Sequence, residues 1–170
     1  MFKSLSLFII TILFFFIAVL FVSTISAEII KKPIITLEVA KKMAESCLNL
    51  AKGDNKKINI AIYESPGSLK YYASMDGTYP ASEEISRLKG KTTAGLPYST
   101  DELRDMAFSG DNPNQGLLTL PTVVLLKGGV PIILKDGTHV GGVGVSGASG
   151  GFDKKCAEEA VKIAMNIMVE

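Results

Sequence analysis

The amino-acid sequence predicts an α+β fold, in which helices pack on the faces of a five-stranded antiparallel sheet. Apolar residues alternate over residues 58–62, which predicts a strand, and the pair Asp136-Gly137 is a strong hairpin signal. Apolar residues recur at helical spacing over 37–52 and 152–169, which predicts a helix near each end of the domain. The order of elements is α-β-β-α-α-β-β-β-α, and its short connections favour antiparallel neighbours.

The segment before the predicted domain resembles a signal peptide. Lys3 gives it a basic start, apolar residues dominate from Leu5 to Val22, and small residues precede Ala27. An uncleaved anchor is the alternative, because about 18 apolar residues can just span a bilayer. We therefore expect residues 1–27 to direct export and 28–170 to form a single domain in the periplasm or outside the cell. Any membrane contact would be through an uncleaved segment.

Charge and hydropathy exclude two classes of protein. The whole chain has 18 basic and 17 acidic residues, and because Lys3 is the only charged residue of 1–27, the rest is neutral overall. A nucleic-acid binder needs a basic surface, so we expect no nucleic-acid partner. The hydrophobic fraction of 47% also excludes a disordered chain.

The first helix is expected over Leu37–Lys52, with Thr36 as its N-cap and Gly53 as the residue that ends it. Two strands, Lys57–Glu64 and Leu69–Met75, then form a hairpin through turn residues at 65–68.

Two helices are expected in the middle of the chain. Ala81–Ala94 is compatible with a helix, although Gly90 weakens it. Ser99 and Glu102 have the spacing of a capping box, which predicts a short helix over Thr100–Phe108. The composition of Ser109–Gln115 then predicts a loop.

Three strands and a closing helix complete the prediction. The strands are Thr122–Lys127, Val130–Lys135 and Thr138–Val145, joined by two-residue turns at Gly128-Gly129 and Asp136-Gly137. The Gly-rich stretch Ser146–Gly151 leads into the helix Phe152–Val169.

The later strands also carry motifs of a known family. Gly128-Gly129-Val130-Pro131 and the run from Asp136 to Gly147 (DGTHVGGVGVSG) resemble the G-G-x-P and D-G-x-x-V-G-x-I-G-V-S-G motifs of the GlcG/HbpS-like family. Upstream, Met75-Asp76-Gly77 and the stretch 89–94 (KGKTTA) resemble its D-G-A and K-A-x-T-A motifs, with Gly90 and Gly142 where Ala is usual.

The resemblance implies an α/β sandwich that assembles into homo-oligomers and binds haem or a related tetrapyrrole as its cofactor, as some members do. A haem-degrading activity is attached to some members, and many have no assigned activity. Two alternatives remain: a small-molecule enzyme or accessory protein acting on an organic acid, and a ligand-free structural or sensory oligomer.

The same resemblance implies a ligand site where the first hairpin meets the helix that follows it. Its candidate residues are Tyr72, Met75, Asp76, Lys89, Thr92, Gly128 and Gly129. Lys89 could meet a propionate, and Tyr72 or Thr92 could approach the iron. The alternatives are sheet packing or an oligomer contact for the tyrosine, and a solvated helix face for the others.

Further patterns have weaker chemical interpretations. Gly142–Gly147 matches G-x-G-x-x-G, but no strand follows it, so close packing is the better reading than a dinucleotide site. Backbone N–H groups at Ser149–Phe152 could hold an anion.

His139, the only histidine, is expected to be an exposed or partly covered strand residue rather than a haem ligand. Ser146 lacks the pattern of a catalytic nucleophile.

Two cysteines, Cys47 and Cys156, lie on the first and last predicted helices. An oxidising compartment would allow them to form a disulfide. Both also fall on apolar stripes, which favours two separate buried thiols.

Overall fold

The computed structural model describes residues 32–168, so the predicted signal peptide lies outside the described residues. Its helices and strands are α2 (Leu37–Gly53), β1 (Asn59–Glu64), β2 (Ser68–Ser74), α3 (Ala81–Gly95), α4 (Thr100–Phe108), the short 3-10 helix η1 (Gln115–Thr119), β3 (Gly129–Ile133), β4 (His139–Ser146) and α5 (Gly150–Ile167). None of the described helices is long and apolar enough to cross a membrane.

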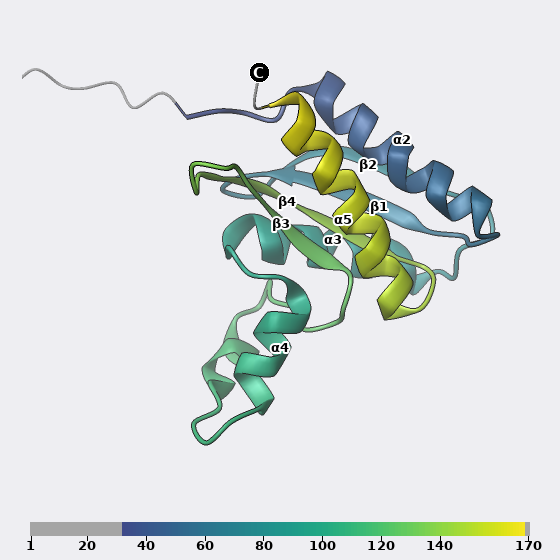
Figure 1. Cartoon of the computed structure of the whole chain (residues 1–170). Coiled ribbons are helices and arrows are strands. Elements are labelled where there is room, and N and C mark those ends of the chain that lie inside the picture. The colour runs from purple at the N-terminus through teal and green to yellow at the C-terminus, as the bar shows by residue number, and fades with distance from the viewer. Residues whose placement is uncertain (1–31, 169–170) are drawn as a thin grey trace, which may run out of the picture. The chain divides into compact units, whose positions relative to one another are not determined.

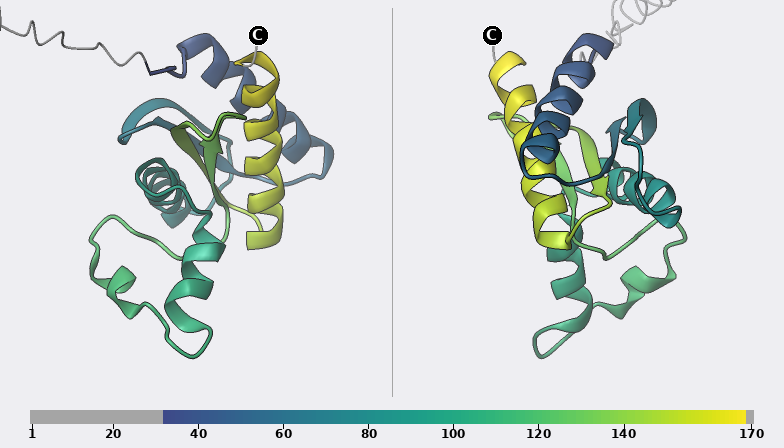
Figure 2. Two further views of the ribbon diagram at one scale, coloured as in Figure 1. Left: turned by 60° about the vertical axis from the view of Figure 1, so that its left-hand side comes forward. Right: turned by 90° about the vertical axis from the view of Figure 1, so that its right-hand side faces the viewer.

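The sheet lies between helices in a three-layer arrangement. Its strand order is β2-β1-β4-β3, with every neighbouring pair antiparallel. Helices α2 and α5 cover one face and α3 covers the other (Figures 1 and 2). The predicted α+β class and antiparallel sheet are therefore confirmed.

The predicted number of strands is wrong, because residues 32–168 contain four strands and not five. The predicted strand Thr122–Lys127 is an irregular segment held by threonines of the neighbouring helices. The hydroxyl of Thr92 donates to the carbonyl of Thr122 at 3.0 Å and accepts the N–H of Val124 at 3.0 Å. The hydroxyl of Thr100 donates to the carbonyl of Leu126 at 2.7 Å. These contacts use backbone groups that a sheet partner would otherwise need.

The predicted turn at Gly128-Gly129 is also absent, because Gly129 is the first residue of β3. The two other predicted turns are present. Residues 65–67 connect β1 to β2 through a cis peptide bond before Pro66, and Gly137 adopts a φ of +85° between β3 and β4.

Helix ends largely follow the predicted caps. Thr36 accepts the N–H of Val39, and the capping box of Ser99 and Glu102 is complete. Gly53, however, remains within α2, and Asn55 instead takes the positive φ just after the helix.

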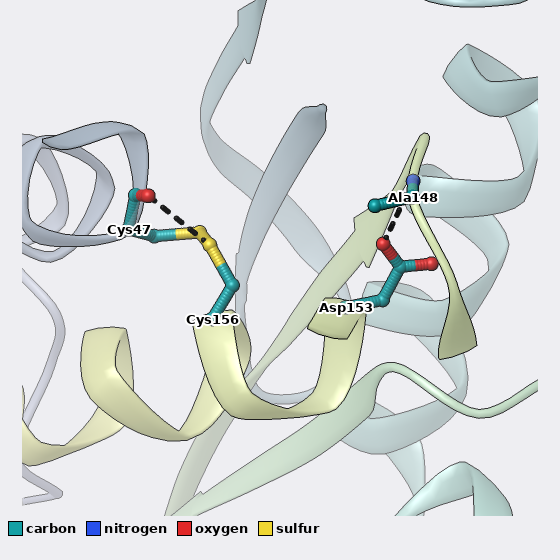
Figure 3. The surroundings of a disulfide bond; sticks show 4 residues. All are labelled: Cys47, Ala148, Asp153 and Cys156. Carbon is teal, nitrogen blue, oxygen red and sulfur yellow. Dashed lines mark hydrogen bonds between the residues drawn. A yellow bond between two sulfur atoms is a disulfide. The ribbon is translucent and has the colours of Figure 1, made fainter. Parts of the chain in front are cut away.

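The main core lies between the sheet and the pair α2–α5. Ile58, Ile60 and Ile62 are fully buried there, which confirms the period-two pattern that predicted β1. In the same layer Cys47 and Cys156 form a disulfide that joins α2 to α5 (Figure 3). Its sequence separation is 109 residues, and a loop of that length contributes up to about 4.7 kcal/mol in the chain-entropy model.

The glycine-rich β4 lets α3 lie directly against the sheet. A Cβ atom added to Gly144 would overlap the carbonyl of Ser86 and the backbone of Gly90. A Cβ atom added to Gly142 would overlap Thr93 and Ala94. The G-x-G-x-x-G pattern thus serves helix–sheet packing, and a bulkier residue would force the two layers apart.

Candidate functional site

The structure separates the predicted site residues into different places. Met75 and Asp76 line one cavity, Lys89 lines another, and these two cavities share no residue. Tyr72 lies on the sheet face that α3 covers, beside Ala61, Tyr63 and Ala94. The two cavities are named here the Met75 cavity and the Lys89 cavity.

The Met75 cavity has a volume of about 390 Å³ and lies where the end of α2 meets the end of β2. Its apolar lining comes from Leu48, Ala73 and Met75, which also pack against the main core. Lys52, Lys57, Ser74 and Asp76 supply its polar lining. The cavity therefore combines an apolar wall with two lysines and one carboxylate.

Neighbouring bonds fix the position of this cavity. The N–H of Met75 donates to the carbonyl of Ile58 at 3.1 Å, which continues the pairing of the two strands past the end of β2. On the helical side, Leu48 follows Cys47 directly, so the disulfide ties this turn of α2 to α5 (Figure 3). The helical wall is thus tied to α5 by the disulfide, and the other wall is held by the pairing of β1 with β2.

The Lys89 cavity has a volume of about 180 Å³ and contains a buried ion pair in its lining. The ammonium of Lys89 donates to Asp153 Oδ2 at 3.1 Å and to the carbonyl of Val145 at 2.7 Å. Both side chains of the pair are only 3% exposed. The pair joins α3, β4 and α5 at one point.

Burial acts on both members of this pair. It lowers the pKa of Lys89 from its ordinary value, against the opposing effect of the Asp153 charge. It raises the pKa of Asp153, again against the effect of Lys89 and of the N–H of Ala148. Removing one partner would leave the other charge buried and unpaired.

Side chains of Ser149 and Asp153 bind backbone N–H groups at the start of α5. Ser149 accepts the N–H of Phe152 at 3.4 Å, and Asp153 Oδ1 accepts the N–H of Ala148 at 3.1 Å (Figure 3).

The remaining candidate residues have structural contacts. Gly128 and Gly129 pack against Lys89, and Cβ atoms there would lie 2.8 Å from Lys89 Nζ and 3.0 Å from Lys89 O, respectively. Thr92 holds the segment after η1, as described above. The guanidinium of Arg87 stacks over the ring of Tyr72, 4.6 Å from its centroid, and the Tyr72 hydroxyl has no partner within the described residues.

His139 is partly buried and its ring is engaged by the backbone. Nε2 lies 2.8 Å from the carbonyl of Thr93 and 2.9 Å from that of Gly141. Two carbonyl acceptors require a hydrogen on Nε2, so this atom is not available as a metal ligand. The expectation of a partly covered strand residue is confirmed. No cluster of His, Cys, Asp or Glu suited to a metal ion occurs within residues 32–168.

The sequence analysis missed several lining residues. Lys52 lies in the last turn of α2 and Lys57 in the segment that leads to β1, and no sequence signal indicates their contact with the end of β2. Asp153 is 64 residues from Lys89, so nothing in the sequence indicates that they pair. Tyr79 and Ser146, whose hydroxyl oxygens lie 3.1 Å apart, also meet only through the fold.

A family described as haem degrading protein HbpS-like matches residues 35–162 of the chain. The chain belongs to the HbpS-like family. Protein GlcG of Escherichia coli (strain K12) is 30% identical over 115 residues, which cover 68% of this chain and 83% of GlcG.

Solved structures of HbpS-like proteins have the same fold. HbpS of Streptomyces reticuli, solved as a double mutant, matches with a TM-score of 0.73 and 27% identity over 84% of this chain and 94% of its own. A PduOC–heme complex matches with a TM-score of 0.69 and 20% identity over 77% of this chain and 95% of its own. At that identity the second match shows the fold alone.

Proposed function

We propose that this HbpS-like protein is exported and binds haem or a related tetrapyrrole at the Met75 cavity. Membership of a family described as haem degrading is the observation that carries this proposal. A heme complex on the same fold supports it.

The lining of the Met75 cavity fits such a ligand. Its volume of about 390 Å³ falls within the range of about 300–1,000 Å³ that is usual for small-molecule sites. A thioether is an established axial ligand of haem iron, and Met75 supplies one. Lys52 and Lys57 carry the charge that suits propionate groups. The apolar lining at Leu48 and Ala73 suits a macrocycle.

Export is supported by two independent features. Residues 1–27 have the sequence pattern of a signal peptide. The Cys47–Cys156 disulfide is typical of proteins that fold in an oxidising compartment. We propose a periplasmic or extracellular location on these grounds.

A haem titration of the disulfide-bonded protein, followed by visible absorbance, tests the proposal. We expect a saturable Soret shift at one haem per chain. Met75→Ala should change the band position and weaken binding, because the soft sulfur ligand is lost. Met106→Ala is the matched control, since Met106 is exposed on α4 and far from the cavity lining.

Lys52→Ala and Lys57→Ala should each weaken haem binding by removing a cation near the propionates. A spectrum that never saturates, or equal affinities of the Met75 and Met106 variants, would contradict this site.

A further inference from the structure

The Lys89 cavity contains more hydrogen-bond donors than acceptors. An ammonium group carries three protons. Within the described residues Lys89 has two acceptors, the carbonyl of Val145 and Asp153 Oδ2. One proton of a lysine that lines the cavity therefore has no protein acceptor.

The acceptors in this lining are already engaged. Asp153 Oδ2 receives Lys89, and Asp153 Oδ1 receives the N–H of Ala148. The carboxylate is 3% exposed, so it has little access to further donors from solvent. Each oxygen of the carboxylate thus already has a donor, whereas one proton of the ammonium has no protein acceptor.

A second donor comes from a pair of hydroxyl groups. Tyr79 Oη and Ser146 Oγ lie 3.1 Å apart, and both residues line the cavity. Whichever hydroxyl donates in this bond, the other keeps its proton for a different acceptor. If Tyr79 donates, the remaining proton belongs to Ser146, which is 1% exposed, so it is directed within the protein or the cavity. If Ser146 donates, the remaining proton belongs to Tyr79, which is 46% exposed and also faces solvent.

The charge and the shape of the Lys89 cavity restrict the class of ligand that it can bind. The ionisable side chains of the lining, apart from Tyr79, are Lys89, Lys127 and Asp153, so the net charge is positive by one unit. Lys127 forms no ion pair within residues 32–168. Ile85, Leu126 and Ala148 supply an apolar surface, and the volume of about 180 Å³ allows only a small molecule.

We propose that the Lys89 cavity binds a short-chain monocarboxylate. Its carboxylate accepts from Lys89 and from the Tyr79–Ser146 hydroxyl pair, and its short aliphatic part lies against Ile85 and Leu126. This binding site shares no residue with the Met75 cavity, so the proposal of a carboxylate site does not depend on tetrapyrrole binding.

Titration of the disulfide-bonded protein with propionate tests this proposal, by calorimetry and by backbone NMR shifts. We expect saturable binding with a Kd below about 10 mM, and shifts centred on Ser146 and Ala148. Propionamide, which has the same shape without the charge, should bind at least about tenfold more weakly, because charge-assisted hydrogen bonds are lost.

Two variants locate the site while leaving the buried ion pair intact. Lys127→Ala and Ser146→Ala should each weaken propionate binding, the first by about tenfold. Lys155→Ala is the matched control, because Lys155 is an exposed lysine of α5 outside the cavity lining, and it should bind as the unchanged protein does.

Three results would overturn the proposal. One is the absence of saturable propionate binding in this concentration range. Another is equal loss of affinity in the Lys127 and Lys155 variants, which would indicate a diffuse charge effect. The third is equal competition by chloride or inorganic phosphate, which would indicate a general anion site without preference for a carboxylate.

Discussion

Gly128 shows at the scale of one residue how the backbone makes room for a buried charge pair. Its φ is +124°, a conformation that residues with a Cβ rarely adopt. A Cβ atom at this position would lie 2.7 Å from the carbonyl oxygen of Val145 and 2.8 Å from Lys89 Nζ. The sequence motif that includes this glycine therefore has a direct steric explanation.

Replacing Gly128 with Ala should destabilise the protein by at least about 1–3 kcal/mol, the usual range for overpacking in a filled interior. Gly53→Ala is the control, because a Cβ at Gly53 meets no atom within 4 Å and Gly53 lies in a helix. Urea unfolding at neutral pH measures both. Similar midpoints for the two variants would contradict the steric argument.

Several residues that the sequence predicts for the site have contacts that the sequence does not indicate. Lys89, which we expect to meet a propionate, forms a buried pair with Asp153. Motif spacing locates a residue along the chain, but such long-range pairs arise only when α3, β4 and α5 meet. The fold also determines that Met75 and Lys89 line separate cavities, because Met75 lies beside α2 whereas Lys89 belongs to α3.

At the scale of elements, three predictions from local sequence patterns are confirmed, because residues close together in the chain determine these features. The alternation over 58–62, the Asp136-Gly137 turn and the capping box of α4 are all present. The segment Thr122–Lys127 has the composition of a strand, yet hydroxyls of Thr92 and Thr100 bind its backbone. A local sequence pattern does not show that hydroxyl groups from two neighbouring helices bind the backbone groups that strand pairing would need.

Helix α4 is joined to α5 by an ion pair that responds to pH. Lys154 Nζ lies 2.7 Å from Asp101 Oδ2. Burial is the largest single effect and would raise the pKa of Asp101, but the hydrogen bonds from Lys154, from Ser99 and from its own backbone N–H, together with the Lys154 charge, outweigh it, so the net pKa lies below its ordinary 3.8. The same bond raises the pKa of Lys154. The folded protein thus favours the ionised form of both groups.

Because the pKa of Asp101 is lower in the folded protein than in the unfolded chain, its ionisation stabilises the fold at pH values above the unfolded-state pKa. This stabilisation is lost as the pH falls through the folded-state pKa. Asp101→Asn should therefore lower the free energy of unfolding at pH 7 and have a smaller effect near pH 3. Asp105→Asn is the control, because Asp105 is an exposed residue of the same helix. Urea unfolding at the two pH values makes the comparison, and a pH-independent difference for Asp101→Asn would contradict the assignment.

At the scale of the whole molecule, α4 and η1 form an arm that extends away from the sheet (Figures 1 and 2). Several of its large apolar side chains are exposed: Met106, Phe108, Leu118 and Leu120. No residue of η1 is buried within the described structure. Exposed apolar patches of this kind mark interaction surfaces.

We propose that this arm holds copies of the chain together, in line with the homo-oligomer expected from the sequence. Phe108→Glu and Leu118→Glu should lower the molar mass measured by analytical ultracentrifugation without changing the far-UV circular dichroism. Leu37→Glu is the control, since Leu37 is an exposed apolar residue on α2, outside the arm. A monomeric unchanged protein, or equal dissociation by the Leu37 variant, would contradict an arm-mediated assembly.

The disulfide between α2 and α5 also makes the domain a covalent ring. Everything between Cys47 and Cys156, including the sheet and the arm, lies inside this closed loop. A single peptide bond broken within the arm, for example by a protease at its exposed loop, would open the ring without dividing the molecule. Because helices α2 and α5 would stay linked across the core, the two fragments would separate only after reduction.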